Sequence, residues 1–202
     1  MKKIKAFTLA EILVTMGIIG VVAALTVPNL VSNYQNKTMA VKARKSVLEI
    51  EEAIDLLLTE EGKNSLTTSS LFGTNGIQNF AEKYLKTISN TDGFASEGYY
   101  PITTTAETKV NKFSCSNESY NGTPYVLADS TAICIVKKTS DIIIYMDING
   151  AEPPNIGGRD MFSYIVNNDT TINKGVTNGC KNQALGGGCI GYLMEHNWKP
   201  IE

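Results

Sequence analysis

The chain has a long apolar run near its beginning, FTLAEILVTMGIIGVVAALTV, which covers residues 7–27. At about 1.5 Å per residue, a helix over this run spans roughly 30 Å, the thickness of the hydrocarbon core of a membrane. The lysines before the run, Lys2, Lys3 and Lys5, should hold that end of the chain in the cytoplasm. A cleavable secretory signal has a shorter apolar core and then a cut site of small residues. The run therefore favours a membrane-anchoring helix.

Glu11 is the acidic residue of this run. A carboxylate inside a membrane segment costs about 2–3 kcal/mol near the centre of the bilayer and less near an end. Glu11 is therefore either a tolerated charge whose side chain reaches the interface, or a group with a specific cationic partner.

Residues 3–28, KIKAFTLAEILVTMGIIGVVAALTVP, resemble the class III signal of type IV pilins and type II secretion pseudopilins. The resemblance implies that prepilin peptidase removes a leader, residues 1–6, by cutting between Ala6 and Phe7. It also implies that Phe7 is then N-methylated. Ala6 departs from the glycine that the family usually has before the cut, although a small residue still fits a peptidase site.

The resemblance also implies roles for Glu11 and Pro28. Glu11 of one subunit would pair with the Phe7 amine of its neighbour and so set the axial register of a filament. Pro28 matches the family's helix-interrupting proline. Because proline lacks a backbone donor, we expect a kink or local melting there. The membrane and assembly helix is thus expected over residues 7–28.

Residues 29–62 are expected to form an amphipathic continuation of the helix that ends near Gly62. Apolar residues recur at spacings of three, four and seven, which predicts one apolar stripe. The stripe is expected to contain Val41, Val47, Leu48, Ile54, Leu57 and Leu58. The charged residues of this segment, such as Lys42, Arg44, Lys45, Glu49, Glu51 and Glu52, should mostly occupy the other face.

The composition changes at residue 63, and residues 63–202 are expected to form a globular part, here called the head. The expected elements are a helix over 77–88, an irregular stretch over 89–124, a hairpin of strands 131–138 and 141–148, and a last strand over 189–194. An antiparallel sheet laid on the amphipathic half of the helix gives an α+β fold, similar to that of pilins.

The four cysteines, Cys115, Cys134, Cys180 and Cys189, all lie in the second half of the chain, without a CxxC motif. An even number in this arrangement favours two disulfides in an oxidising compartment. Of the three pairings that four cysteines allow, Cys115–Cys134 with Cys180–Cys189 closes the shortest loops and so has the smallest entropic cost of closure.

Residues 147–162, DINGAEPPNIGGRDMF, resemble a segment that is common in pseudopilin-like proteins. Asp147, Asn149 and Asp160 offer hard oxygen ligands, and related secretion pseudopilins bind calcium in a late loop. The full twelve-residue calcium-loop pattern is absent. The alternative is a turn whose Asx side chains satisfy the backbone. No other cofactor is expected.

Composition narrows the function further. The net charge of −2 argues against nucleic-acid binding, which needs clustered Lys and Arg. The chain has one histidine, His196, and no GxSxG, HExxH or phosphate-loop motif, so we do not expect an enzyme.

The leading hypothesis is a type II secretion pseudopilin in the bacterial inner membrane, single-pass, with a cytoplasmic N-terminus and a periplasmic head. It would polymerise into a periplasmic filament. The alternatives are a type IV pilin for adhesion, motility or DNA uptake, and a membrane-anchored enzyme. The expected partners are membrane lipid, prepilin peptidase, inner-membrane assembly machinery, and further copies of the chain or other pilin-like subunits.

Overall fold

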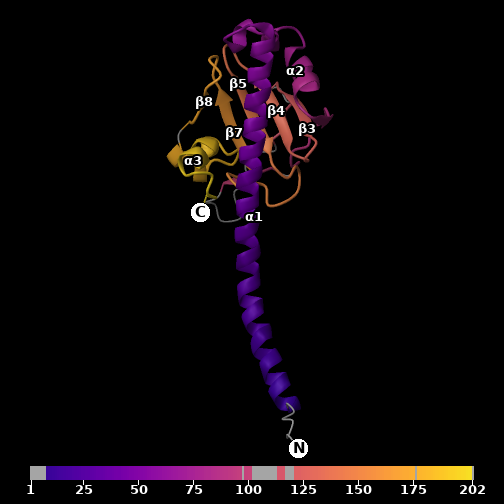
Figure 1. Ribbon diagram of the computed structural model, residues 1–202, viewed down its shortest axis with the longest axis vertical. Helices are drawn as coiled ribbons and strands as arrows, with labels where there is room; N and C mark the ends of the chain where they lie inside the picture. The colour runs from indigo at the N-terminus through magenta and orange to yellow at the C-terminus, as the bar shows by residue number, and fades with distance from the viewer. Residues whose placement is uncertain (1–7, 97, 102–112, 117–120, 176, 202) are drawn as a thin grey trace, which may run out of the picture. The chain divides into compact units, whose positions relative to one another are not determined.

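The computed structural model describes residues 8–96, 98–101, 113–116, 121–175 and 177–201 (Figure 1). The chain divides into two compact units, Met1–Thr38 and Met39–Glu202. Helix α1 (Leu9–Glu61) contributes residues to both units. The order of a long N-terminal helix followed by a β-sheet confirms the predicted α+β class.

In the first unit, α1 is helical at Pro28 and on both sides of it. The local melting expected at this residue is therefore wrong. A proline inside a helix removes one backbone hydrogen bond, whereas the bonds formed before and after it are kept because helix propagation is cooperative.

In the second unit, one face of α1 is buried against the sheet. Its buried apolar residues recur at spacings of three and four, which is the period of a helix: Ala40, Ala43, Val47, Ile50, Ala53, Ile54, Leu57 and Leu58. The predicted stripe was therefore partly wrong. Val41 and Leu48 were placed in it, but they are 63% and 44% exposed. The alanines, which let the helix lie close to the sheet, take the core positions instead.

The sheet has the order β1-β3-β4-β5-β7-β6-β2, and β8 pairs with β7. Its strands are β1 (Thr87–Ser89), β2 (Tyr100–Pro101), β3 (Thr123–Leu127), β4 (Ala132–Lys137), β5 (Ile142–Asp147), β6 (Ile156–Gly157), β7 (Met161–Val166) and β8 (Ile172–Asn173). The predicted hairpin is confirmed as β4 and β5, with Ala132 opposite Asp147 and Lys137 opposite Ile142. The sheet is mixed rather than purely antiparallel, because β6 runs parallel to both β2 and β7.

Both faces of the central strands are covered. On β4, Ile133 and Ile135 belong to the core that includes α1, whereas Cys134 and Val136 belong to a second cluster with Tyr99 and Phe113 on the other face. This double burial explains why the sequence of β4 is an almost unbroken apolar run instead of an alternating one.

Short helices complete the second unit. They are η1 (Leu66–Thr68), η2 (Ser70–Phe72), α2 (Gly76–Tyr84), η3 (Thr177–Asn182) and α3 (Cys189–Glu195). The predicted helix over 77–88 ends at Tyr84, because Thr87–Ser89 pairs with β3. The predicted last strand over 189–194 is wrong, since this segment is helix α3. Its buried residues Cys189, Ile190 and Leu193 follow the helical spacing, which a six-residue apolar run does not distinguish from a strand.

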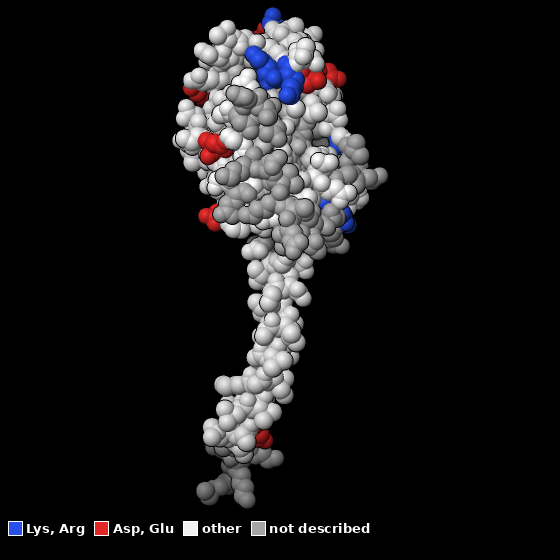
Figure 2. All heavy atoms as spheres, turned by 180° about the vertical axis from the view of Figure 1, so that it is seen from behind, with Lys and Arg blue, Asp and Glu red and all other residues white. Residues whose placement is uncertain are grey.

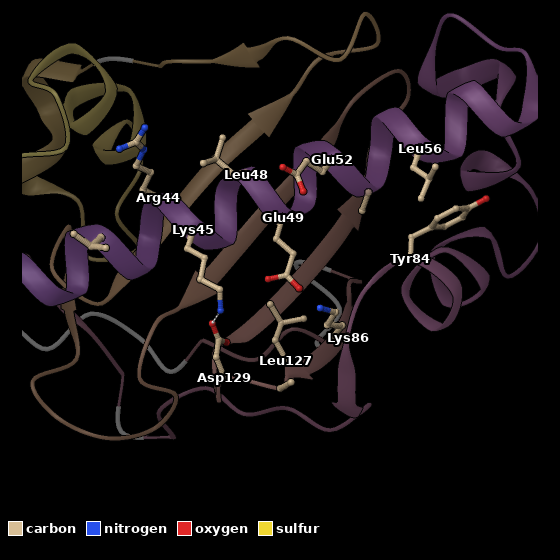
Figure 3. Close-up of a pocket in the computed structure, with 13 residues that line it drawn as sticks. Arg44, Lys45, Leu48, Glu49, Glu52, Leu56, Tyr84, Lys86, Leu127 and Asp129 are labelled. Carbon is tan, nitrogen blue, oxygen red and sulfur yellow. Dashed lines mark hydrogen bonds and ion pairs between the residues drawn. The ribbon is translucent and has the colours of Figure 1, made fainter.

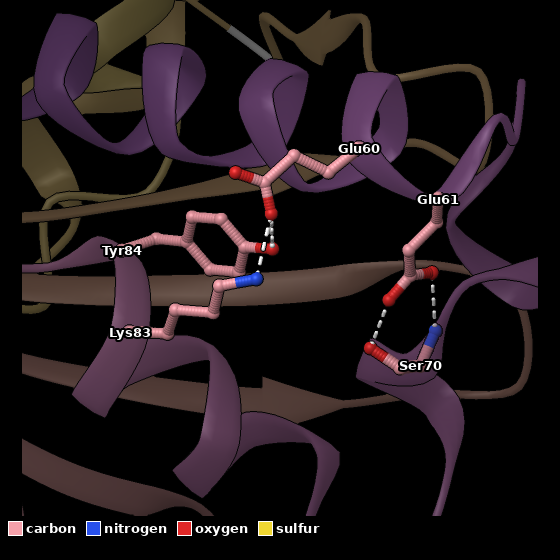
Figure 4. A network of polar contacts seen from close by, with 5 residues as sticks. All are labelled: Glu60, Glu61, Ser70, Lys83 and Tyr84. Carbon is pink, nitrogen blue, oxygen red and sulfur yellow. Dashed lines mark hydrogen bonds and ion pairs between the residues drawn. The ribbon is translucent and has the colours of Figure 1, made fainter.

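Polar contacts fasten the C-terminal end of α1 to the segments that follow it (Figure 4). Glu60 accepts hydrogen bonds from Lys83 Nζ at 2.6 Å and from the Tyr84 hydroxyl at 2.8 Å. Glu61 accepts one from the backbone N–H of Ser70 at 2.9 Å and a second from its hydroxyl. These contacts hold α2 and η2 beside the last turn of the helix.

The two faces of α1 predict different responses to truncation. Ile50→Ala should lower the free energy of unfolding by about 2–5 kcal/mol, because Ile50 is fully buried and the truncation leaves a cavity. Val41→Ala should change it by less than about 0.5 kcal/mol, because that side chain is exposed. Denaturant unfolding of the full chain in detergent measures both. Equal losses would contradict the assignment of the faces.

Candidate assembly site

The N-terminal part of α1 exposes its apolar side chains on all sides. Leu9 and Leu25 are 78% and 71% exposed, and the segment is long and apolar enough to cross a membrane. From Leu9 to residue 36 the charged residue is Glu11. In Figure 2 this stretch is correspondingly white apart from a red carboxylate. So much exposed apolar surface requires lipid or protein to cover it.

Glu11 is held by Thr8, the residue before the helix begins. Glu11 Oε2 accepts hydrogen bonds from the Thr8 backbone N–H and from the Thr8 hydroxyl, both at 2.8 Å. The backbone N–H of Glu11 donates to Thr8 Oγ1 at 3.3 Å. This reciprocal arrangement is a capping box, whose signature is Thr or Ser followed three residues later by Glu. Thr8 and Glu11 match that signature in the sequence, so this contact could be predicted from two residues.

The capping box gives Glu11 a local role besides the predicted one. The carboxylate satisfies backbone and hydroxyl donors at the start of the helix, so part of its cost in an apolar setting is offset within the chain. Ala6 and Phe7, with the predicted cleavage and methylation, lie outside the described residues. Processing at these residues and pairing with a neighbour's amine stay predictions.

Asp147 is the last residue of β5, and Asn149 and Asp160 lie between β5 and β7 on either side of β6. All three support the backbone. Asp160 accepts hydrogen bonds from the backbone N–H groups of Asn155 and Ile156, both at 2.6 Å. Asn149 Nδ2 donates to the carbonyls of residues 152 and 153 at 2.6 and 3.0 Å, and the Asn149 backbone N–H donates to Asp147 at 3.3 Å. This geometry is what the Asx-turn alternative predicts.

Calcium binding at this loop stays a prediction. In the described part of the chain, no three His, Cys, Asp or Glu side chains are grouped so that they could hold a metal ion. Asp147 has a further partner from a distant part of the sequence, the Tyr99 hydroxyl, which donates to Oδ2 at 2.5 Å.

Burial changes the acidity of both aspartates. Burial raises the pKa of Asp147 to about 8; the charge of Asp160 adds to the increase, and the hydrogen bond from Tyr99 opposes it. The pKa of Asp160 is also raised by burial, against hydrogen bonds from the backbone N–H groups that lower it. The pKa of Tyr99 is raised by burial and by the Asp147 charge. The folded state therefore favours the protonated form of Asp147.

Two disulfides connect parts of the second unit, and they are the local pairs expected from loop length. Cys115 pairs with Cys134 on β4, and Cys180 in η3 pairs with Cys189 at the start of α3. Gly122 passes close to the first disulfide. A Cβ at this residue would lie 2.5 Å from Cys134 Sγ and 2.8 Å from Cys115 Sγ, so a glycine is required there.

The raised pKa of Asp147 predicts a pH-dependent stability. The stabilising contribution of this group is fully present below its unfolded pKa, near 4, and is lost as the pH rises through about 8. Asp147→Asn should therefore gain stability relative to the wild type between about pH 5 and pH 8. Asp169→Asn is the control, because hydrogen bonds from Thr171 lower the pKa of exposed Asp169. Parallel pH profiles for wild type and Asp147→Asn, measured by denaturant unfolding, would contradict the prediction.

Comparison with known proteins identifies the N-terminal segment. Residues 1–27 match a protein family described as the prokaryotic N-terminal methylation motif. No curated protein and no solved structure matches the chain. The match covers the basic start, the capping box and most of the exposed apolar helix. The chain therefore carries the N-terminal signal of type IV pilins and pseudopilins.

Proposed function

We propose that this protein is a pseudopilin of a type II secretion system. It is a structural subunit that is stored in the inner membrane and polymerises into a periplasmic filament. The methylation motif over residues 1–27, joined to a helix whose N-terminal part exposes its apolar side chains, supports a pilin-like subunit. The resemblance of residues 147–162 to a segment common in pseudopilin-like proteins favours the secretion system.

Polymerisation has a physical basis in that exposed surface. Lipid covers the apolar part of α1 in the stored subunit, and the helices of neighbouring subunits cover it in the filament. Cleavage after Ala6 would create a cationic amine at Phe7, which needs an anionic partner once it leaves water. Glu11 supplies that partner from a neighbour. Until then, the hydrogen bonds from Thr8 satisfy the carboxylate.

The proposal names partners and a location. Prepilin peptidase cleaves and methylates the precursor, and inner-membrane machinery assembles it with further copies or with other pilin-like subunits. The lysines of the leader hold the N-terminus in the cytoplasm, so the head, residues 63–202, lies in the periplasm. That compartment is oxidising, as the disulfides Cys115–Cys134 and Cys180–Cys189 require.

A type IV pilin for adhesion, motility or DNA uptake is the second candidate. The disulfide Cys180–Cys189 near the C-terminus favours it, because many pilins close their last loop in this way. Deletion of the gene separates the two candidates. A pseudopilin mutant loses secreted proteins from the medium and keeps surface motility, whereas a pilin mutant shows the reverse.

Processing is the first testable consequence. Protein purified from a bacterium with an active prepilin peptidase should lack residues 1–6 and carry one added methyl group on Phe7. Intact-mass and N-terminal peptide measurements check this, with a strain lacking the peptidase as the control. An N-terminus at Met1 in the strain that has the peptidase would contradict it.

The effect of Glu11 variants on filament incorporation is the second testable consequence. Glu11→Ala should keep normal membrane levels, since the apolar segment only becomes more apolar, but incorporation into sheared filaments should fall at least ten-fold. Breaking a buried charge pair can cost about 3–5 kcal/mol. Glu11→Asp should restore little, because the shorter carboxylate must bridge the same gap.

Thr8→Val separates the two roles of Glu11. This variant removes the hydroxyl contacts of the capping box and leaves the carboxylate in place. Incorporation should therefore stay well above that of Glu11→Ala. If the two variants lose incorporation equally, Glu11 acts through helix capping rather than through a neighbour's amine.

A further inference from the structure

Helix α1 becomes amphipathic after Val27, within the unit Met1–Thr38. Residues 27–36, here called the juxtamembrane segment, have exposed apolar side chains at spacings of three, four and seven residues from the first, which is the spacing of one helical face. These side chains are 52%, 72%, 47% and 72% exposed, in the order Val27, Leu30, Val31 and Tyr34. At 3.6 residues per turn, the opposite face contains neutral polar side chains: Asn29, Ser32, Asn33 and Asn36.

The juxtamembrane segment contains no charged residue. The first charged residue after Glu11 is Lys37, which follows the segment directly. A helix face that meets water usually has charged side chains. Neutral amides, in contrast, donate and accept hydrogen bonds without the cost of taking a charge out of water. This composition suits a boundary between an apolar medium and water.

The exposed apolar residues of the unit Met39–Glu202 have different neighbours. Leu48 and Leu56 of α1 are 44% and 50% exposed and, with Leu127, line a groove of about 790 Å³ (Figure 3). Charged side chains stand among them, including those of Lys45 and Asp129, which form an ion pair at 3.0 Å. Such a charged surface is compatible with water, whereas the juxtamembrane segment combines exposed apolar residues with neutral polar ones.

The position of the segment along α1 matches the edge of a bilayer. At about 1.5 Å per residue, about 33 Å of helix separates Leu9 from Val31, and about 38 Å separates Leu9 from Tyr34. The hydrocarbon core is about 30 Å thick, and a bilayer with its head groups is about 40–45 Å thick. A helix whose apolar stretch exceeds the core tilts, which shortens its rise across the membrane. When Leu9 lies at one edge of the core, Val31 therefore lies near the other edge and Tyr34 among the head groups.

Tyr34 and Lys37 have the chemistry of residues at that depth. The tyrosine ring is apolar with a polar hydroxyl at its end, and tyrosines gather where acyl chains meet head groups. The Lys37 ammonium, about 4.5 Å further along the axis, is attracted to anionic lipid phosphates. The amides on the other face of the segment can form hydrogen bonds with ester and phosphate oxygens. Both faces of the segment thus have partners in a phospholipid head-group layer.

We propose that the juxtamembrane segment binds the phospholipid head-group layer of the periplasmic leaflet, and that Tyr34 fixes the depth of the subunit in the membrane. The face with Val31 and Tyr34 points towards the acyl chains, and the face with Asn33 points towards water. Lipid is the occupant because the segment continues the membrane-spanning helix without a break. This inference rests on the proposed function, which places the subunit in the inner membrane with its head in the periplasm.

Thiol labelling tests which face the lipid covers. All four native cysteines are in disulfides, so an introduced cysteine supplies the free thiol. The full chain is expressed in a bacterium without filament-assembly machinery, and spheroplasts are treated with a membrane-impermeant maleimide. Asn33→Cys should be labelled at least ten times faster than Val31→Cys. A segment surrounded evenly by water, or evenly by lipid, gives equal rates and would overturn the proposal.

Variants of Tyr34 test the depth. On the Val31→Cys background, Tyr34→Ala should raise the labelling rate about five-fold, because the segment loses its aromatic anchor and moves towards water. Tyr34→Trp should leave the rate unchanged, because tryptophan has the same preference for the head-group layer. Gln35→Ala is the matched control and should have no effect, since Gln35 lies outside the apolar face. An unchanged rate in Tyr34→Ala would overturn the role of Tyr34.

A strain that assembles filaments distinguishes lipid from protein. Protection of Val31→Cys in both strains supports lipid. Protection in the filament-forming strain alone would mean that a neighbouring subunit covers the apolar face, and it would overturn the proposal.

Lys138→Cys, at an exposed residue of the head, separates this inference from the proposed function. It should be labelled in spheroplasts. Labelling of Lys138→Cys only after lysis would refute the periplasmic head, while faster labelling of Asn33→Cys than of Val31→Cys in the lysed membranes would leave the contact with lipid standing. Equal rates for Val31→Cys and Asn33→Cys, beside a labelled Lys138→Cys, would refute the contact with lipid and leave the function standing.

Discussion

The unit Met39–Glu202 depends on the close packing of α1 against the β-sheet. Ala40, Ala43 and Ala53 face the sheet and bring the helix axis near it, while Val47 and Ile50 fill the space between them. Interiors are packed to the density of organic crystals, so this face tolerates little change in volume. The same packing determines which side of α1 stays exposed, and Val41 and Leu48 lie on that side.

The two units thus leave apolar surface uncovered in different ways. From Leu9 to Val27, α1 is largely apolar around its whole circumference, and such a surface is compatible with lipid or with a bundle of like helices. After Met39, the exposed apolar residues form a line with charges interspersed. The first kind of surface is uniform apart from Glu11, so its apolar side chains by themselves favour no register. The second kind of surface has charged side chains, among them Arg44 and Glu52, between its apolar ones.

Much of this architecture could be predicted from the sequence, since strong patterns have few interpretations. The apolar run over residues 7–27 and the β-branched runs of β4 and β5 are of this kind. The prediction of the apolar stripe on α1 is partly wrong because alanine is only weakly hydrophobic, although alanines occupy core positions there. The prediction of a strand in the segment Cys189–Glu195 is wrong because a short apolar run fits a helix and a strand equally well.

The candidate functional residues also differ in whether their contacts can be predicted from the sequence. The capping box of Thr8 and Glu11 is a local signature and could have been found. The hydrogen bond from Tyr99 to Asp147 could not have been predicted, since only the folded sheet brings together these residues, which are 48 positions apart. Nor could the sequence show that Asp147 is fully buried, which is the cause of its raised pKa.

The edge strands of the sheet affect how strongly copies of the chain aggregate. An exposed edge strand offers unpaired N–H and C=O groups to any other strand, and long flat edges aggregate. Here β1 has three residues with an irregular register, β8 has two, and β2 has two, of which Pro101 lacks an N–H donor. Strand-to-strand addition is therefore poorly supported at these edges. Copies of the chain at high local concentration are therefore protected against edge-to-edge aggregation.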